Sequence, residues 1–232
     1  NNAEIALGLQ TLLKATLKIK PLLFNENTSY QFSCDIHFST SWGWGSSSTL
    51  ISNIANWAGI DPFELNRMVS SGSGYDIAAS SSSTPFLYQL KGNEREVIPV
   101  AFNPTFKENI YFIYLGRKQN TSASIEKNLC LVRNEKMTST ITWLTEKITE
   151  EENMDEFVRY MVEHETIISK TINIPRVKEE YFSDFDGEIK SLGAWGGDFA
   201  MVVSPLPETR IKHYFSNKGL KTLFKFDEIV KN

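Results

Sequence analysis

Apolar residues at the start of the chain recur at the spacing of an α-helix. The apolar residues Ile5, Leu9, Leu12, Leu13 and Leu17 stand at positions i, i+4, i+7, i+8 and i+12. This spacing places the side chains on one face of a helix, and Pro21 cannot continue the helix because its ring removes the backbone N–H. The pattern therefore predicts a helix that ends before Pro21.

The segment that follows has a different period. Apolar and polar side chains alternate without a break over residues 30–39. Successive side chains of a strand point to opposite faces, so the alternation predicts a strand with one exposed face. A glycine- and serine-rich stretch comes next, and residues 50–58 then return to helical spacing until Gly59. The predicted order is strand, glycine-rich loop, helix.

Capping residues predict a further helix directly afterwards. Asp61 is a suitable N-cap, Pro62 suits the first helical position, and Glu64 stands where it closes a capping box. We expect this helix to end near Ser70. Residues 70–85 are rich in serine and glycine, which by composition alone is typical of a linker, but the aromatic strand that follows argues against a loose tether.

The remaining periodic segments predict a mixture of strands and helices. Strands are expected at residues 86–90, 96–101, 109–116 and 220–226, and in the apolar run that follows the glycine-rich turn 190–198. Helices are expected at residues 139–149 and 154–172 and before Gly187, and residues 208–218 are expected to form a helix or a loop.

Composition narrows the class of protein. Of 232 residues, 41% are hydrophobic and 22% are charged, which is typical of a packed globular chain. The net charge of −4, without a basic cluster, argues against nucleic acid as a partner. Cys34 and Cys130 lie far apart and outside any C-x-x-C, so we expect neither a metal knuckle nor a disulfide framework, and a reducing cytoplasm fits best. No apolar run approaches the roughly 18 residues of a membrane helix, so no membrane partner is expected.

The glycine-rich stretch Gly-Trp-Gly-Ser-Ser-Ser at residues 43–48 is a candidate phosphate site. The first N–H groups of a helix point outward and carry partial positive charge, and glycine allows an anion to approach the backbone closely. The alternative is a flexible turn, because serine is a good N-cap and glycine a good turn former. The stretch contains no Walker motif, and Ser48 stands where a Rossmann fingerprint has its third glycine.

The three histidines share no metal-ligand spacing, so no function is assigned to them.

Three motifs, in this order, resemble those of the GHMP kinases. W-G-W-G-S-S-S-T at residues 42–49 resembles the second motif of that family, S-G-S-G-Y-D-I-A at 71–78 its acidic segment, and K-S-L-G-A-W-G-G-D at 190–198 its third motif. G-Y-D-I-A at 74–78 is similar to the pentapeptide of the GYDIA, mevalonate kinase-like branch. The resemblance implies an α+β fold with a ribosomal protein S5 domain 2-like N-terminal lobe (residues 1–118) and a ferredoxin-like C-terminal lobe (residues 119–232).

The resemblance also implies an activity and its cofactors. A GHMP kinase transfers the γ-phosphoryl group of ATP to a small-molecule hydroxyl, with Mg²⁺. The acceptor that the branch implies is mevalonate or a related isoprenoid precursor. A sugar or amino-alcohol kinase of the same fold is one alternative, and a catalytically silent protein that binds a nucleotide or metabolite is another.

The resemblance implies roles for particular residues. ATP would be bound by Gly43, Gly45, Ser46, Ser47 and Ser48 of the second motif and by Gly193, Gly196 and Gly197 of the third. The Ser47 hydroxyl would be a Mg²⁺ ligand, and Asp76 would orient or deprotonate the acceptor hydroxyl. From the residues alone, Asp76 is better explained as a helix N-cap. Glu64 is a further candidate metal ligand, although its capping-box position already explains it. Lys190 opens the third motif, with a solvated lysine as the alternative.

The chain departs from the family pattern at several places. Ser39 stands where the second motif usually has proline and Trp44 where it has leucine, and Trp195 and Asp198 replace glycines of the third motif. An extra carboxylate near a triphosphate is repulsive unless Mg²⁺ screens it. No first motif precedes the predicted N-terminal helix, so we expect the N-terminal strands of the fold to be absent from this chain.

Overall fold

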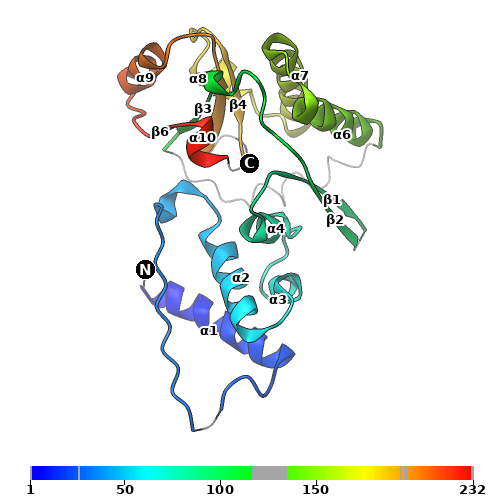
Figure 1. Ribbon diagram of the computed structural model, residues 1–232, viewed down its shortest axis with the longest axis vertical. Coiled ribbons are helices and arrows are strands. Elements are labelled where there is room, and N and C mark those ends of the chain that lie inside the picture. The colour runs from blue at the N-terminus through cyan, green and yellow to red at the C-terminus, as the bar shows by residue number, and fades with distance from the viewer. Residues whose placement is uncertain are drawn as a thin grey trace. The chain divides into compact units, whose positions relative to one another are not determined.

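The computed structural model describes residues 2–25, 27–92, 94–116, 135–193, 195 and 198–230 (Figure 1). The chain divides into two compact units, of which unit 1 comprises Asn1–Thr40 and Trp44–Pro99, and unit 2 comprises Ser41–Gly43 and Val100–Asn232. The predicted lobe boundary between residues 118 and 119 lies outside the described residues. Within the described part of the chain, no helix is both long enough and apolar enough to span a bilayer.

Unit 1 packs helices around a small apolar core and ends in a β-hairpin. Its elements are α1 (Asn2–Ile19), α2 (Ser46–Ala58), α3 (Pro62–Val69), α4 (Tyr75–Ser81), β1 (Phe86–Lys91) and β2 (Glu94–Pro99). The core contains buried side chains of the first four elements: Leu12, Ala15, Ile51, Ile54, Ala55, Leu65 and Ile77. β1 and β2 pair antiparallel.

The helices of unit 1 begin and end where their capping residues predict. Asp61 is the N-cap of α3, and its side chain accepts a hydrogen bond from the backbone N–H of Phe63 at 3.0 Å. α2 ends at Gly59, whose left-handed backbone (φ +64°) is one that other residues rarely adopt. The predicted helices before Pro21, before Gly59 and after Asp61 are therefore confirmed.

The strand predicted at residues 30–39 does not form. The segment is without regular structure up to residue 36, and no described strand pairs with it. Its Tyr30 and Phe32 rings instead pack against Trp57 of α2, with ring centroids 5.9 and 4.7 Å apart. Alternation indicates which side chains share a face, but a strand also requires a neighbour for its backbone hydrogen bonds. The prediction was wrong because the described chain supplies no such neighbour.

Unit 2 is built on a four-stranded antiparallel sheet. Its strands are β3 (Ile110–Tyr114), β4 (Glu188–Ser191), β5 (Phe199–Val203) and β6 (Leu223–Lys225), in the order β4-β5-β3-β6. Its α-helices are α6 (Glu135–Glu150), α7 (Met154–Ile172), α8 (Val177–Tyr181), α9 (Glu208–Asn217) and α10 (Phe226–Ile229). The predicted strand at 109–116 is thus β3, at the centre of this sheet.

Both faces of this sheet are covered, which explains the continuous apolar sequence of β3 and β5. Alternate residues such as Ile113 and Val202 pack with Phe215 of α9 on one face. The residues between them, such as Phe112, pack with Phe157 of α7 on the other. β5 is buried along its whole length because it lies inside the sheet with helices on both sides.

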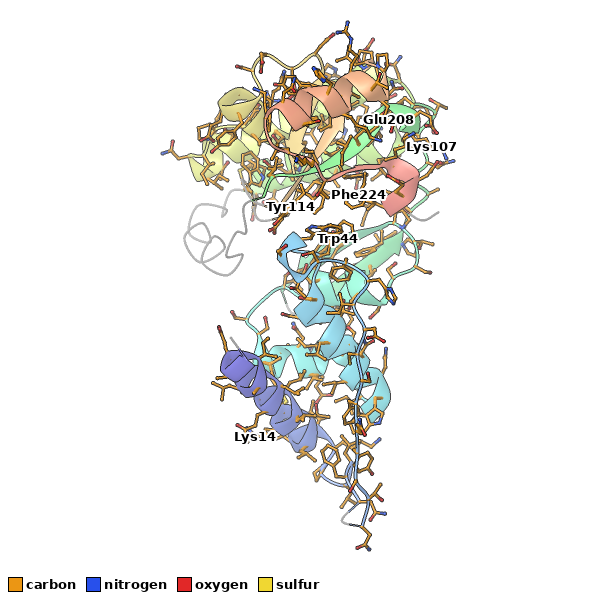
Figure 2. All side chains as sticks on the ribbon, turned by 90° about the vertical axis from the view of Figure 1, so that its left-hand side faces the viewer. Lys14, Trp44, Lys107, Tyr114, Glu208 and Phe224 are labelled. Atoms are coloured by element: carbon orange, nitrogen blue, oxygen red, sulfur yellow. The ribbon has the colours of Figure 1, made fainter. Side chains whose placement is uncertain are left out.

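A short segment from the first half of the chain, Ser41–Gly43, also belongs to unit 2. The Trp42 ring lies 5.3 Å from the Phe224 ring and 6.5 Å from the Tyr114 ring, measured between centroids. The Tyr114 hydroxyl donates a hydrogen bond to the backbone carbonyl of Ser41 at 2.9 Å. Tyr114 and Phe224, labelled in Figure 2, come from the neighbouring strands β3 and β6. The start of the glycine-rich loop is therefore fixed on the sheet of unit 2.

Candidate functional site

The glycine- and serine-rich loop leads into an uncapped helix start. α2 begins at Ser46, and its N-cap Gly45 is left-handed (φ +74°, ψ 33°) and offers no side chain to the free amides. The described hydrogen bonds include none donated by the amides of Ser46, Ser47 or Ser48, and the first bond inside the helix runs from Thr49 N to Gly45 O at 2.9 Å. The first turn carries no acidic residue. Free amides at the positive end of the helix dipole suit an anion such as phosphate.

The surroundings of this helix start leave room for a ligand. A Cβ placed on Gly45 would have no described atom within 4 Å. The Ser47 side chain is exposed, and no described hydrogen bond involves the hydroxyls of Ser46, Ser47 or Ser48. Hydroxyl and phosphate oxygens are ligands that Mg²⁺ accepts. The residues at the start of α2 therefore fit nucleotide phosphates and a magnesium ion.

Asp76 lies in the first turn of α4. The N-cap of this helix is Gly74, with a left-handed backbone (φ +86°), and Asp76 is the second helical residue. Asp76 is therefore not a helix N-cap, and that explanation of the residue was wrong. Its neighbours Ile77 and Ala78 are buried and hold the helix in the core, while the Asp76 side chain reaches solvent. Partial burial raises the pKa of the Asp76 carboxyl above its usual value, which favours a carboxylate acting as a base.

The serine- and glycine-rich loop before Asp76 is held in place by the hairpin. The Tyr88 hydroxyl of β1 donates a hydrogen bond to the Ser73 carbonyl at 2.6 Å, and the Tyr75 ring meets the Tyr88 ring edge-on with centroids 5.8 Å apart. α4 packs against α2, beside which it lies in Figure 1, and the Oγ atoms of Ser52 and Ser80 are 2.6 Å apart. Asp76 thus belongs to a helix that is fixed against α2, and the loop is not a loose tether.

Glu64, the second candidate metal ligand, is exposed on α3. No described hydrogen bond joins its carboxylate to the Asp61 backbone, so the predicted capping box is not closed. Asp61 instead pairs with Arg95 of β2 at 3.2 Å. Among the described residues, no three His, Cys, Asp or Glu side chains gather as metal ligands do.

The third motif begins in β4 and extends to the start of β5. Gly193 is left-handed (φ +65°), and Trp195 also has a positive φ (+37°), which is rare for a residue with a large side chain. Gly196 and Gly197 lie outside the described residues. The motif therefore keeps a backbone typical of glycine even where it carries tryptophan.

Within unit 2, the second and third motifs meet at one point. Gly43 is left-handed (φ +68°), and a Cβ placed on it would overlap the carboxylate of Asp198. A side chain at this position would require the Asp198 carboxylate to move, and the left-handed backbone by itself favours glycine. In the sequence, Asp198 stands out only as a departure from the family pattern, and nothing connects it with Gly43.

Lys190, the first residue of the third motif, is not a solvated lysine. Its side chain is 15% exposed, and its Nζ lies 3.6 Å from Glu165 Oε1 and 3.4 Å from His164 Nδ1. Burial lowers the pKa of Lys190, and the Glu165 carboxylate opposes this effect. Sequence reasoning assigned no role to Glu165 or His164, which come from α7.

His164 is expected to make the stability of unit 2 depend on pH. Burial and the neighbouring Lys190 lower the pKa of His164 to about 4, while an unfolded histidine titrates near 6.5. Between these values the unfolded chain binds more protons than the folded chain, so stability falls as the pH drops from about 6.5 to about 4. A full shift corresponds to about 3 kcal/mol, and we expect about 1–2 kcal/mol because the ring is partly accessible to water.

Urea unfolding of wild type and His164→Gln at pH 7 and pH 4.5 measures this contribution. Glutamine does not titrate and can still accept a hydrogen bond from Lys190, so the variant should lose about 1–2 kcal/mol less than wild type between the two pH values. Burial raises the pKa of Glu165 and gives a pH dependence of opposite sign, but both proteins share it. Equal losses in the two proteins would mean that His164 is not held neutral.

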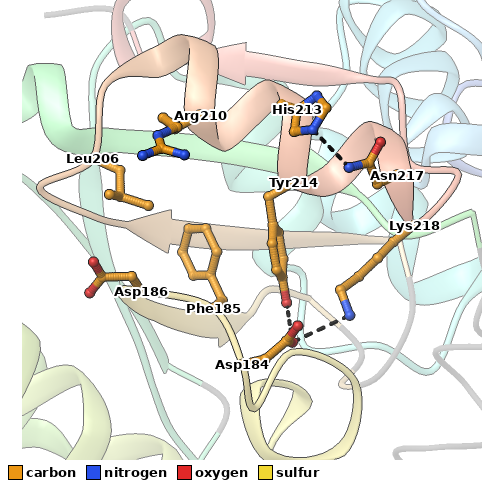
Figure 3. A pocket seen from close by; sticks show the side chains of 9 residues that line it. All are labelled: Asp184, Phe185, Asp186, Leu206, Arg210, His213, Tyr214, Asn217 and Lys218. Carbon is orange, nitrogen blue, oxygen red and sulfur yellow. Dashed lines mark hydrogen bonds and ion pairs between the residues drawn. The ribbon is translucent and has the colours of Figure 1, made fainter.

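Unit 2 also contains a pocket that none of the predicted site residues lines (Figure 3). Its volume is about 500 Å³, and it lies between α9 and the segment before β4, lined by Asp184, Phe185, Asp186, Leu206, Arg210, His213, Tyr214, Asn217 and Lys218. Asp184 Oδ1 accepts a hydrogen bond from the Tyr214 hydroxyl at 2.5 Å and lies 3.3 Å from Lys218 Nζ. Burial and the Asp184 carboxylate raise the pKa of Tyr214. Asp184 of the lining is thus paired with Tyr214 and Lys218.

Comparison with known proteins finds likeness in structure only. No protein-family model matches the chain, and no curated protein matches it in sequence. A crystal structure of L. major mevalonate kinase in complex with R-mevalonate superposes with a TM-score of 0.56 and 14% identity, covering 78% of this chain and 64% of that one. A second crystal structure of mevalonate kinase gives a TM-score of 0.58 and 18% identity, covering 92% of this chain and 73% of that one. The chain spans less than two thirds of the L. major protein, and at these identities the likeness extends to the fold alone.

Proposed function

We propose, from the premise that this chain has the α+β fold of the GHMP kinases, that it is an ATP-dependent kinase acting on a small-molecule hydroxyl. The proposal rests on the juxtaposition of two features of unit 1. The uncapped amides of Ser46, Ser47 and Ser48 form an anion site at the start of α2, and the helix that bears Asp76 packs against α2. This arrangement combines a site for phosphate with a carboxylate that can act on an acceptor.

The residues at the start of α2 have the main role in binding ATP. Phosphoryl transfer depends on positioning and charge neutralisation more than on covalent chemistry with the protein. The backbone of Gly45 and the amides of Ser46–Ser48 bind phosphate oxygens. The Ser47 hydroxyl would hold Mg²⁺, which would supply positive charge against the phosphates. The resemblance of the motifs supports a contribution of Gly43, Gly193, Gly196 and Gly197 to ATP binding. For Glu64 as a second metal ligand, the described contacts offer no support.

Asp76 acts on the acceptor. Its carboxylate accepts or orients the proton of the acceptor hydroxyl, the hydroxyl oxygen forms a bond to the γ-phosphorus, and the bond from that phosphorus to ADP breaks. Proton transfer from an alcohol is easier to a carboxylate whose pKa is raised, as partial burial raises that of Asp76. The reaction leaves a phosphorylated alcohol and ADP.

The acceptor that we propose is mevalonate or a related isoprenoid precursor. The G-Y-D-I-A segment around Asp76 supports this choice, and so does the fold shared with two mevalonate kinases, one of which was crystallised with R-mevalonate. A sugar or an amino alcohol is the alternative acceptor.

A coupled ADP-release assay on the full protein with MgATP tests the proposal. Mevalonate, phosphomevalonate, homoserine and several sugars are tried as acceptors, and ATP binding is measured separately by calorimetry. We expect ADP release that depends on mevalonate. ADP release that depends on a sugar or on homoserine would support the kinase activity and contradict the proposed acceptor. ATP binding without turnover on any acceptor would favour a catalytically silent protein, and absence of ATP binding would overturn the phosphate site.

A further inference from the structure

Glu165 of α7 is a carboxylate with no exposure to solvent in unit 2. Its Oε1 accepts a hydrogen bond from the backbone N–H of Ser191 at 2.9 Å and lies 3.6 Å from Lys190 Nζ. Its Oε2 lies 3.9 Å from Arg176 Nε. A buried carboxylate is costly unless it is paired, and an apolar side chain of similar volume would often be at least as stable in its place. Core stability alone therefore does not explain a glutamate here.

The partner of Glu165 is the last residue of an edge strand. β4 lies at the end of the described sheet and pairs with β5, with Ser191 opposite Ala200. The edge of a sheet leaves backbone groups that need other partners. Glu165 is such a partner, because it accepts a hydrogen bond from the Ser191 amide. Ser191 lies two residues before Gly193, where the left-handed backbone of the third motif begins.

A network of ion pairs also joins β4 to α7 and α8. Arg176, whose side chain is 9% exposed, lies 2.6 Å from Glu188 Oε1 and 3.3 Å from Glu179 Oε1. Glu188 and Lys190 stand two residues apart on β4, so their side chains lie on one face of the strand. The two cations Arg176 and Lys190 thus join α7 and the start of α8 to both ends of β4.

We propose that Glu165 is a positioning residue for the glycine-rich turn between β4 and β5. By binding the Ser191 amide and the Lys190 ammonium together, it fixes the point from which the turn starts. This inference rests on the proposed function, because it assumes that the turn contacts ATP. A backbone segment that is already fixed at one end loses less conformational freedom when it binds a ligand.

Two substitutions separate the hydrogen bond of Glu165 from its charge. Glu165→Gln keeps an oxygen for the Ser191 amide and removes the negative charge, whereas Glu165→Met removes both at similar volume. Glu163→Gln is the matched control. Glu163 lies on the same helix, but its side chain is 46% exposed, and it lies 3.9 Å from Arg159 of α7. The measurements are the KM for ATP, the kcat, and amide hydrogen exchange over residues 188–193 without nucleotide.

We expect Glu165→Met to raise the KM for ATP about tenfold, with kcat changed less than threefold, and to speed exchange at residues 191–193 at least tenfold. Glu165→Gln should recover most of both effects, and Glu163→Gln should match wild type. If Glu165→Met does not fold, a KM raised two- to threefold in Glu165→Gln with a matching increase in exchange supports the inference. Wild-type KM and exchange in Glu165→Gln and Glu165→Met, with ATP bound normally, would overturn it and leave the proposed function intact. Failure of the wild-type protein to bind ATP would overturn both.

Discussion

Asp76→Asn is expected to lower acceptor-dependent ADP release by at least about two orders of magnitude, while MgATP binds within about twofold of wild type. A positioned general base contributes about 10²–10⁴-fold to a reaction of this kind. Asparagine has nearly the same shape and preserves the packing of Ile77 and Ala78 below it, but it cannot accept the proton. The rate constant kcat from the coupled assay and the dissociation constant from calorimetry together test the expectation.

The pH profile gives an independent readout of the same carboxylate. Because burial raises the pKa of Asp76, wild-type kcat should fall as the pH drops through that raised value, and this fall should be absent from the residual activity of Asp76→Asn. Asp35→Asn, at an exposed carboxylate of the irregular segment 30–36, is the matched control and should keep the wild-type rate. A fully active Asp76→Asn would refute the catalytic role.

Gly43→Ala is expected to destabilise the protein by about 3 kcal/mol and to weaken ATP binding at least tenfold. A left-handed backbone costs a residue other than glycine about 1–2 kcal/mol, and forcing an extra carbon into a filled space costs about 1–3 kcal/mol more. The extra carbon would overlap the Asp198 carboxylate, so either that side chain or the loop must move. Urea unfolding and calorimetric titration with MgATP measure the two effects.

Two further variants separate the cost of the left-handed backbone from the cost of the overlap with Asp198. Gly45→Ala carries the same backbone penalty, with φ +74°, but its new carbon meets no described atom within 4 Å, so its unfolding free energy should fall by only about 1 kcal/mol. Gly43→Ala combined with Asp198→Ala removes the overlap and should return close to the stability of Gly45→Ala. A double variant no more stable than Gly43→Ala would show that the contact with Asp198 is not the cause.

The helices of this protein could be predicted from sequence because the signals are local. The capping residues of α3 and Gly59 at the end of α2 act within one turn of the chain, and the apolar period of α7 predicted its bounds. The predicted α+β fold is confirmed by the likeness to two solved structures of mevalonate kinases. Residues 30–39 and β4 were less predictable because a strand depends on a partner that is distant in sequence.

Some residues of the candidate site could be predicted from local sequence, and others could not. The glycines, the serines and Asp76 stood out because they lie in short motifs. The contact between Gly43 and Asp198 joins residues from opposite halves of the chain, and no local pattern reveals it. Glu165 did leave a signal: it follows Phe157 and Met161 at intervals of four and therefore stands on the buried stripe of α7. A lone acidic residue in an apolar stripe indicates a buried partner.

The attachment of Trp42 to the sheet of unit 2 limits how the protein can be divided. The chain belongs to unit 1 up to Thr40, to unit 2 for three residues, and to unit 1 again from Trp44 to Pro99. A truncated fragment that ends at Pro99 would lack the rings of Tyr114, Phe199 and Phe224 that cover Trp42, and would expose this indole to water beside the glycine-rich loop. Nor does a fragment that begins at Val100 include Trp42. A division of the chain at residue 99 would therefore separate the start of the glycine-rich loop from the aromatic residues that hold it.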